Sequence, residues 1–198
     1  QGYFSGRFPP GKKDSDLSAV VLKNFLEAHV QVYHTLKKME NGPGVKIGLV
    51  KNINQFDPWR RWHLLDWLIS NAVNQFFNDS TIEFLRTGIF KIRIPGLAWI
   101  HHDNPRAIGS TDFFGLNYYS HNHLKMQFSI EEPFTMQYPD KDILTDMPYT
   151  IYGEGMYRAI ESVSVLNVPI IITENGVADA TDDRRKLYIQ RYLYAVSK

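Results

Sequence analysis

A glutamate that follows a strongly apolar segment is the best candidate for chemistry in this sequence. Residues 168–176 read Val-Pro-Ile-Ile-Ile-Thr-Glu-Asn-Gly, so that Glu174 ends a run typical of a buried strand. A carboxylate at the carboxyl end of a barrel strand faces the mouth where barrels place their active sites. The competing interpretation is an exposed glutamate before an Asn-Gly turn, and the spacing alone leaves both open.

A second apolar segment ends in polar and aromatic side chains. Residues 112–119 read Asp-Phe-Phe-Gly-Leu-Asn-Tyr-Tyr, and in a strand Asn117 and Tyr119 share one face while Tyr118 takes the other. A tyrosine hydroxyl beside a carboxylate can hold it in one rotamer and stabilise its ionised form by hydrogen bonding. A tyrosine in the core is the alternative, and the sequence does not decide between the two.

Several other chemistries lack their usual signatures. The sequence has no Gly-x-Gly-x-x-Gly after a strand, no Gly-x-x-x-x-Gly-Lys-Ser/Thr and no Gly-x-Ser-x-Gly, which argues against dinucleotide binding, nucleoside-triphosphate binding and serine hydrolysis. Cysteine is absent, so thiol nucleophiles and disulfides are excluded. His101-His102-Asp103 is the single metal-ligand candidate, interpreted as a polar loop because adjacent histidines in regular structure point apart. We therefore expect no metal and no cofactor.

The composition is that of a soluble globular protein, with 43% hydrophobic and 22% charged residues. The 198 residues suffice for one sizeable core and are too few for two ordinary domains. A net charge of +1 argues against a nucleic-acid partner. No apolar run approaches the ~18–20 residues of a membrane span, and no signal-peptide pattern opens the chain. The lack of cysteine favours the cytoplasm only slightly, since many secreted proteins also lack it.

Hydrophobic periodicity indicates the elements that position these groups. A first helix is predicted from residues 14–16 to the Asn-Gly-Pro-Gly stretch at 41–44. Its apolar stripe is expected to consist of Leu17, Val21, Phe25, Ala28, Val32 and Leu36. Buried strands are expected at 45–50, 112–119 and 170–173, further helices at 59–77, 153–166 and from 184 onward, and loops at 1–11, 78–110 and 121–150.

This order alternates helices with apolar strands, which is typical of an α/β protein with a parallel sheet. An open doubly wound sheet and part of a (β/α)₈ TIM barrel both fit. The long segments that follow the strands favour the barrel, because barrels build their active sites from such loops. A complete barrel takes about 250 residues and eight strands, so three strands indicate a piece of a larger fold.

Taken together, these segments resemble glycoside hydrolase family 1, the retaining β-glucosidase-like enzymes. The stretch Ile172-Thr173-Glu174-Asn175-Gly176 matches the family's nucleophile motif without a departure, and residues 112–119 look like its sixth strand. Residues 2–11 look like the loop after its fourth strand, residues 45–52 are similar to its fifth strand, and residues 152–157 look like the entry to its sixth helix. Five motifs in register make the resemblance specific, although residues 86–105 match the family poorly.

The resemblance implies a role for each candidate residue. Glu174 is expected to be the nucleophile that forms a glycosyl-enzyme ester, and Tyr119 the residue that orients it. Asn117 is expected to be a polar neighbour in the same sugar site. Tyr149 stands where the family often has tryptophan, which would alter one wall of the sugar pocket. The implied activity is retaining hydrolysis of β-glycosides, with glucoside or galactoside preference and transglycosylation left open.

The resemblance also implies missing parts. Residues 1–198 are expected to be a single partial catalytic barrel of strands 5–7 with their helices, lacking strands 1–4, the acid/base glutamate of strand 4, and strand 8. The expected partners are a β-glycoside substrate and the remaining barrel segments, in the same or a complementary chain. We expect the segment alone to be inactive and not to fold cooperatively, because its sheet edges are open. The alternative is a non-catalytic carbohydrate-binding or structural fragment.

Overall fold

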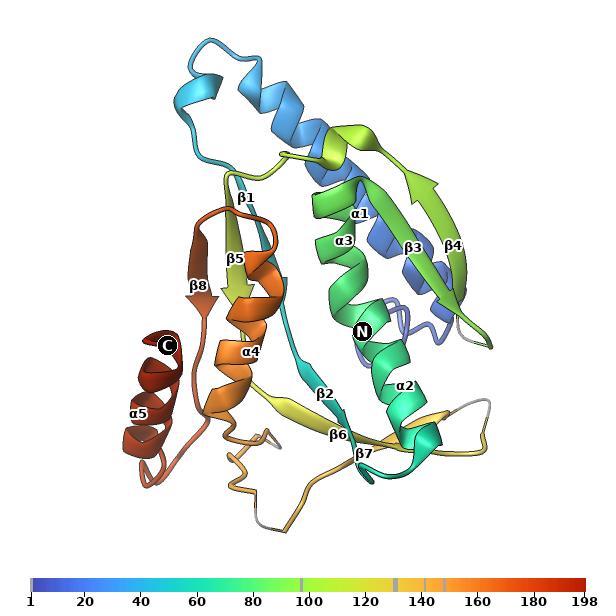
Figure 1. The fold of residues 1–198 in the computed structure, drawn as a ribbon, viewed down its shortest axis with the longest axis vertical. Helices are drawn as coiled ribbons and strands as arrows, with labels where there is room; N and C mark the ends of the chain where they lie inside the picture. Colours follow the sequence, from blue (N-terminus) through green and yellow to red (C-terminus); the bar gives the residue numbers. More distant parts are fainter. Residues whose placement is uncertain (1, 97, 130–131, 141, 148) are drawn as a thin grey trace. The chain divides into compact units, whose positions relative to one another are not determined.

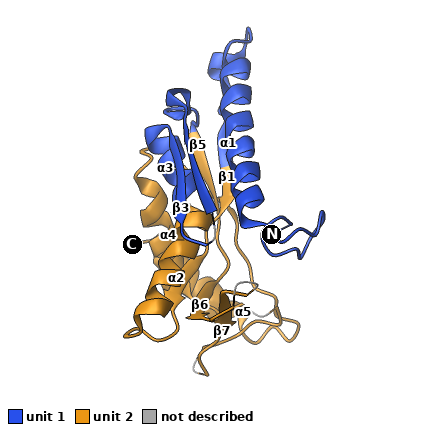
Figure 2. Cartoon of the chain, turned by 90° about the vertical axis from the view of Figure 1, so that its right-hand side faces the viewer, with its two compact units in different colours: residues 1–49, 79–112 blue, residues 50–78, 113–198 orange. Residues whose placement is uncertain are grey.

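The computed structural model describes residues 2–96, 98–129, 132–140, 142–147 and 149–198, and it divides the chain into two compact units. The first unit comprises residues 1–49 and 79–112, and the second comprises residues 50–78 and 113–198 (Figures 1 and 2). Each unit thus draws on two separate stretches of the chain. The sequence indicated neither the division nor its boundaries.

The first unit is built on a long helix and an antiparallel hairpin. Asp14 caps the helix by accepting a hydrogen bond from the Leu17 backbone N–H at 2.9 Å. The hairpin strands β3 and β4 are fully in register, and α1 packs on β4 while α3 packs on β3. The elements are α1 (Ser15–Lys37), η1 (Gly42–Gly44), α3 (Ser80–Thr87), β3 (Ile89–Ile94), β4 (Ala98–Asp103) and η3 (Pro105–Ala107).

The buried face of α1 differs from the predicted stripe. Its buried residues are Ala19, Leu26, Val30 and Tyr33, whereas Phe25 is 71% exposed. The helix is apolar around more than half of its circumference, so periodicity alone could place the stripe on either side. Of the predicted stripe, Leu17 and Val21 are partly buried, and Phe25, Ala28, Val32 and Leu36 are exposed.

The interpretation of residues 78–110 as a loop was wrong. This segment holds α3 and the β3–β4 hairpin, which turns at Pro95-Gly96. The strict alternation of Phe90, Ile92 and Ile94 with polar residues is the period of a half-buried strand, and all three are buried. Phe84 of α3 closes this core against Phe90 in an edge-to-face contact with ring centroids 6.2 Å apart.

The second unit contains the three predicted strands in one sheet. The strand order is β1–β5–β8, with β5 and β8 parallel, as the alternating pattern predicted. Helix α4 packs against β5 and β8, and α5 packs against α4, as Figure 1 shows. The elements are β1 (Gly48–Asn52), which starts at the end of the first unit, β5 (Phe113–Asn117), α4 (Gly153–Ser164), β8 (Ile170–Glu174) and α5 (Arg185–Val196).

A second sheet extends from the first and was not predicted. Strand β6 pairs parallel with β2 and antiparallel with β7, so the expected loop at 121–150 is partly strand. Helix α2 packs on β2 and β6 and begins at Leu64 rather than near Trp59. The elements are β2 (Gln55–Pro58), α2 (Leu64–Asn74), the π-helix η2 (Gln75–Asp79), β6 (His121–Met126) and β7 (Phe134–Gln137).

The two faces of the β1–β5–β8 sheet differ sharply in burial. Phe114, Leu116 and Tyr118 are fully buried on the side of α4. The expectation that β8 is a buried strand was wrong, because Ile171 is 47% exposed and the following residues of β8 are exposed too. Strand β8 is the edge of its sheet within the described residues, so its other face and its free edge meet solvent.

Candidate active site

The predicted nucleophile lies beside the predicted polar neighbour because β5 and β8 are out of step by one residue. Leu116 lies opposite Ile172, but Asn117 lies opposite Glu174, so Thr173 is an extra residue on β8. Residues that are directly paired in a parallel ladder project to the same face. The bulge thereby places Glu174 on the face of Asn117, and without it Glu174 would point to the opposite face.

Tyr119 and Glu174 are joined by a hydrogen bond. The Tyr119 hydroxyl donates to Glu174 Oε2 at 3.1 Å, and Oε1 has no hydrogen-bond partner among the described residues. Burial raises the pKa of Tyr119, and the hydrogen bond to Glu174 raises it further, so the phenol stays a proton donor at neutral pH. The arrangement thus fixes one of the two carboxylate oxygens of Glu174.

Asn117 is held at both its backbone and its side chain. Its carbonyl oxygen accepts from the Ile53 backbone N–H at 2.9 Å, which anchors the residue to the chain after β1. Its side-chain Oδ1 accepts from the Thr173 hydroxyl at 2.6 Å. Thr173 belongs to the motif that singled out Glu174, but its type and spacing gave no sign of this contact.

Tyr149 lies near the other residues without a hydrogen bond between them. Its ring centroid is 6.5 Å from that of Tyr119, with the two planes tilted by 37°. Tyr149 is 39% exposed, so one part of its ring is available to a ligand. The structure therefore brings together all four residues expected from the sequence, with Tyr119 as the common neighbour of Glu174 and Tyr149.

Buried tyrosines hold the backbone next to this site in place. The Tyr192 hydroxyl of α5 donates to the Tyr119 carbonyl oxygen and accepts from the Tyr152 backbone N–H, both at 3.2 Å. The Tyr118 hydroxyl donates to the Tyr152 carbonyl oxygen at 3.0 Å. Tyr188 stacks on Tyr192 with ring centroids 3.9 Å apart. These contacts connect α4 and α5 to the backbone that carries Tyr119, and the sequence gave no signal for them.

A charged cluster fixes the start of β6, two residues after Tyr119. Asp57 of β2 accepts from His121 Nε2 at 2.7 Å and from Arg158 of α4 at 2.8 and 3.1 Å. Burial favours a higher pKa for Asp57, but the hydrogen bonds from His121 and Arg158 outweigh it and hold that pKa well below its usual range. The sequence analysis missed these three residues, since they lie 64 and 37 positions apart and form no motif.

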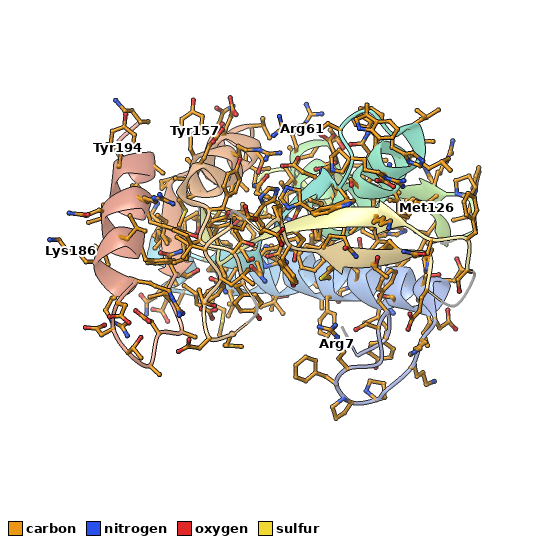
Figure 3. The ribbon with its side chains drawn as sticks, turned by 90° about the horizontal axis from the view of Figure 1, so that it is seen from below. Arg7, Arg61, Met126, Tyr157, Lys186 and Tyr194 are labelled. Atoms are coloured by element: carbon orange, nitrogen blue, oxygen red, sulfur yellow. The ribbon has the colours of Figure 1, made fainter. Side chains whose placement is uncertain are left out.

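A groove of about 590 Å³ lies elsewhere in the second unit; Tyr152 lines it, but Asn117, Tyr119, Tyr149 and Glu174 do not. It is lined by residues that include Tyr157 of α4 and Tyr194 of α5, whose side chains extend outward in Figure 3. By contrast, Glu174 is exposed on an open sheet face. The candidate active site is therefore defined by the contacts of Glu174, and it does not coincide with this groove.

The predicted polar loop at His101-His102-Asp103 is part of β4. His102 Nε2 contacts Glu27 Oε1 at 2.8 Å, and His101 Nε2 contacts Asp103 Oδ1 at 3.0 Å. The two histidines thus engage different carboxylates. Among the described residues, no group of three or more histidine, cysteine, aspartate or glutamate side chains is arranged to hold a metal ion.

Across the residues that the structure describes, no helix combines the length and the apolar character that a bilayer crossing requires.

Comparison with known proteins identifies the family. The model of Glycosyl hydrolase family 1 matches residues 1–198. The β-galactosidase of Pyrococcus woesei is 25% identical over 98% of this chain and 42% of that protein. β-Glucosidase A of Thermotoga maritima is 25% identical over 89% of this chain and 41% of that protein. The structure of a β-glycosidase from Pyrococcus horikoshii superposes with a TM-score of 0.82 at 25% identity, covering 98% of this chain and 44% of that one.

The chain therefore belongs to glycosyl hydrolase family 1. Its fold is part of a (β/α)₈ barrel, as the sequence predicted, and the open doubly wound sheet is the alternative that was wrong. The chain spans less than half the length of these relatives.

Proposed function

We propose that the complete protein to which this chain belongs hydrolyses β-glycosides with retention of configuration, and that Glu174 is its nucleophile. The observation that carries the proposal is the hydrogen bond from Tyr119 to Glu174 Oε2, at the carboxyl ends of two neighbouring parallel strands. Barrels place catalytic groups at these ends. Membership of family 1 and relatives named β-galactosidase and β-glucosidase support the same reaction class.

The proposed reaction has two displacements at one carbon. Glu174 Oε1 attacks the anomeric carbon, the bond to the leaving group breaks, and the leaving oxygen takes a proton from a second carboxylic acid. That group, about 5–5.5 Å away in retaining enzymes, is the acid/base glutamate expected outside this chain. It then removes a proton from water, which attacks the same carbon and releases Glu174. Two inversions leave the configuration unchanged.

Three other residues have supporting roles in this proposal. The hydroxyl of Tyr119 holds Oε2 and thereby aims Oε1 at the sugar. Asn117 offers a polar side chain beside Glu174, and the exposed part of the Tyr149 ring forms one wall of the sugar pocket. The choice between glucosides and galactosides is assigned to residues outside residues 1–198.

Remaining barrel segments are proposed to cover the open apolar surface of this chain. Val50 and Ile171 are 53% and 47% exposed on one face of the sheet, and parallel sheets are stable when both faces are covered. The denatured mass of the purified protein tests this proposal. A mass well above 23.0 kDa places the segments in the same chain, and a mass near 23.0 kDa requires a complementary chain. Cooperative unfolding and turnover by a lone 23.0 kDa chain would refute the proposal.

Labelling of the nucleophile tests the catalytic proposal. A 2-deoxy-2-fluoro β-glycoside with a good leaving group should inactivate the complete protein and add one fluoroglycosyl group to the peptide that contains Glu174. The fluorine slows both formation and hydrolysis of the ester, and the good leaving group restores the rate of formation only, so the adduct accumulates. The Glu174→Gln variant is the matched control, because it keeps the size of the side chain and removes the nucleophilic charge. This variant should take up no label and lose at least about 10³-fold in kcat.

The outcomes separate the two hypotheses raised by the sequence. Label on Glu174 together with a product of retained anomeric configuration supports the enzyme. Label on another carboxylate, or inverted product, contradicts the assignment of Glu174. Sugar binding by calorimetry without turnover or label would instead support the non-catalytic carbohydrate-binding alternative.

A further inference from the structure

The extra residue of the bulge, Thr173, has a hydroxyl that points at Asn117. The Thr173 hydroxyl donates to Asn117 Oδ1 at 2.6 Å, a short and strong contact for two neutral groups. The two ends of an asparagine amide differ, since Oδ1 only accepts and Nδ2 only donates. Asn117 Nδ2 has no hydrogen-bond partner among the described residues. The amide therefore has one satisfied end and one free donor end.

The surroundings of Thr173 hold its hydroxyl in place. A Cβ atom at Gly115 would lie 3.2 Å from both Cγ2 and Oγ1 of Thr173 and 2.7 Å from Cγ2 of Val50. The absence of a side chain at Gly115 thus makes the space that the threonine occupies. The β-branched side chain of threonine also has few χ1 rotamers. The contact with Asn117 is consequently set by the strand and by a glycine on the neighbouring strand.

We propose that Thr173 is a positioning residue, which acts by fixing the orientation of the Asn117 amide. By occupying Oδ1, it turns the Nδ2 donors toward a sugar bound at Glu174, where they meet the hydroxyl adjacent to the anomeric carbon. This inference rests on the proposed β-glycosidase function. Its geometric basis is the pairing of Asn117 with Glu174, which sets the amide beside the attacking carboxylate.

The proposal has an energetic consequence. Without the Thr173 hydroxyl, the amide can rotate by half a turn and present its carbonyl oxygen to the sugar. Hydrogen bonds to the 2-hydroxyl strengthen in the transition state of retaining glycosidases, so their loss slows the reaction more than it weakens binding. Loss of one such neutral contact corresponds to a decrease of about tenfold in kcat/KM.

The test compares Thr173→Val with Thr173→Ser in the complete protein. Valine keeps the shape of threonine and removes the hydroxyl, whereas serine keeps the hydroxyl and removes the methyl group. For an aryl β-glycoside with its 2-hydroxyl, we expect T173V to lower kcat/KM about tenfold and T173S to stay within about twofold of the wild type. For the 2-deoxy glycoside, T173V should lower kcat/KM by less than about twofold, because this substrate has no 2-hydroxyl for the Asn117 amide to bind.

Equal losses by T173V on both substrates would indicate a general structural role and overturn the proposal. So would a T173V variant with unchanged kinetics on the 2-hydroxyl substrate.

A second readout does not depend on activity. In protein labelled with [¹⁵N]asparagine, the Asn117 side-chain amide should give one pair of resonances in the wild type and in T173S. In T173V, this pair should broaden or shift. An unaltered amide spectrum in T173V overturns the positioning role even if no glycoside is hydrolysed. If the folded wild type is inactive but the amide spectra are as expected, the proposed function is refuted while the positioning of Asn117 by Thr173 stands.

Discussion

Asn117 on β5 lies directly opposite Glu174 on β8, although the preceding pair is Leu116 with Ile172. The extra residue of β8, Thr173, donates its hydroxyl to Asn117 Oδ1, and Glu174 after it departs from the alternation of the strand. One bulge therefore gathers three polar side chains on one face of a sheet. A bulge next to a candidate active site is a common way to re-aim a side chain.

The Tyr119→Phe variant tests the contact with Glu174. Removing the hydroxyl leaves Glu174 Oε2 without its donor, and a hydrogen bond to a charged group contributes about 1.5–3 kcal/mol. We expect kcat/KM to fall by about 10- to 100-fold in the complete protein, with little change in the denaturant midpoint. Tyr157→Phe is the matched control, since Tyr157 is 41% exposed on α4, and its kinetics should not change. Equal kinetics for both variants would contradict the orienting role.

The Gly155→Ala variant tests the packing beneath Tyr119. A Cβ atom at Gly155 would lie 1.9 Å from the hydroxyl oxygen of Tyr118, which is fully buried and already bonded to Tyr152. Overpacking of this kind costs about 1–3 kcal/mol of unfolding free energy, or more where the ring cannot move. Urea denaturation of the complete protein measures the loss. Gly44→Ala is the control, because a Cβ atom there meets nothing within 4 Å, and it should change stability by less than about 1 kcal/mol.

Stability at high pH tests the burial of Tyr192. Burial raises the pKa of this phenol to about 12, against about 10 in an unfolded chain. Because the folded pKa is the higher one, the contribution of Tyr192 is complete below pH 10 and is lost as the pH rises toward 12. The wild type should therefore lose up to about 1.4 kcal/mol per pH unit from this group across that interval.

The Tyr192→Phe variant isolates that contribution. Phenylalanine cannot ionise, so the difference in unfolding free energy between the two proteins should change from pH 10 to 12 in favour of the variant. Denaturant titrations of the complete protein at several pH values give the difference directly. A constant difference would mean that Tyr192 is not buried as the structure has it.

Stability at low pH tests the Asp57 cluster. Hydrogen bonds from His121 and Arg158 hold the pKa of Asp57 below its unfolded value of about 4. A lowered folded pKa stabilises the protein above pH 4, and this contribution disappears as the pH falls further. We expect Arg158→Gln to lower the unfolding free energy at pH 7. The difference in unfolding free energy between this variant and the wild type should narrow between pH 5 and 2.5. If that difference in unfolding free energy stays constant with pH, the effect of Arg158 is due to packing alone.

Local patterns predicted the strands that carry the site. The apolar runs before Asn117 and Glu174 are long enough to identify β5 and β8, and the rule that parallel strands end at one edge placed their last residues together. The bulge was not predictable in this way. Neither glycine nor proline occurs between Ile170 and Glu174, so nothing in the local sequence marks the extra residue.

Other features depend on contacts that no local pattern encodes. Helix α1 is apolar on two sides, and only packing on β4 decides that Leu26 is buried while Phe25 is exposed. The polar residues of β6 look like a loop, yet they form a strand because β2 and β7 provide partners on both sides.

The β3–β4 hairpin, by contrast, did carry a local signal, since Phe90, Ile92 and Ile94 alternate strictly with polar residues.

The bond from Tyr192 to the Tyr119 carbonyl oxygen has a consequence for the order of assembly. The two residues are 73 positions apart, and a ribosome makes Tyr119 long before α5. Strand β5, which leads to Tyr119, can pair early, but the last constraint on the Tyr119 backbone comes from a helix made several seconds later. The backbone that positions Tyr119 against Glu174 is thus fixed only after α5 has been made. A nascent chain that stops before α5 lacks this constraint.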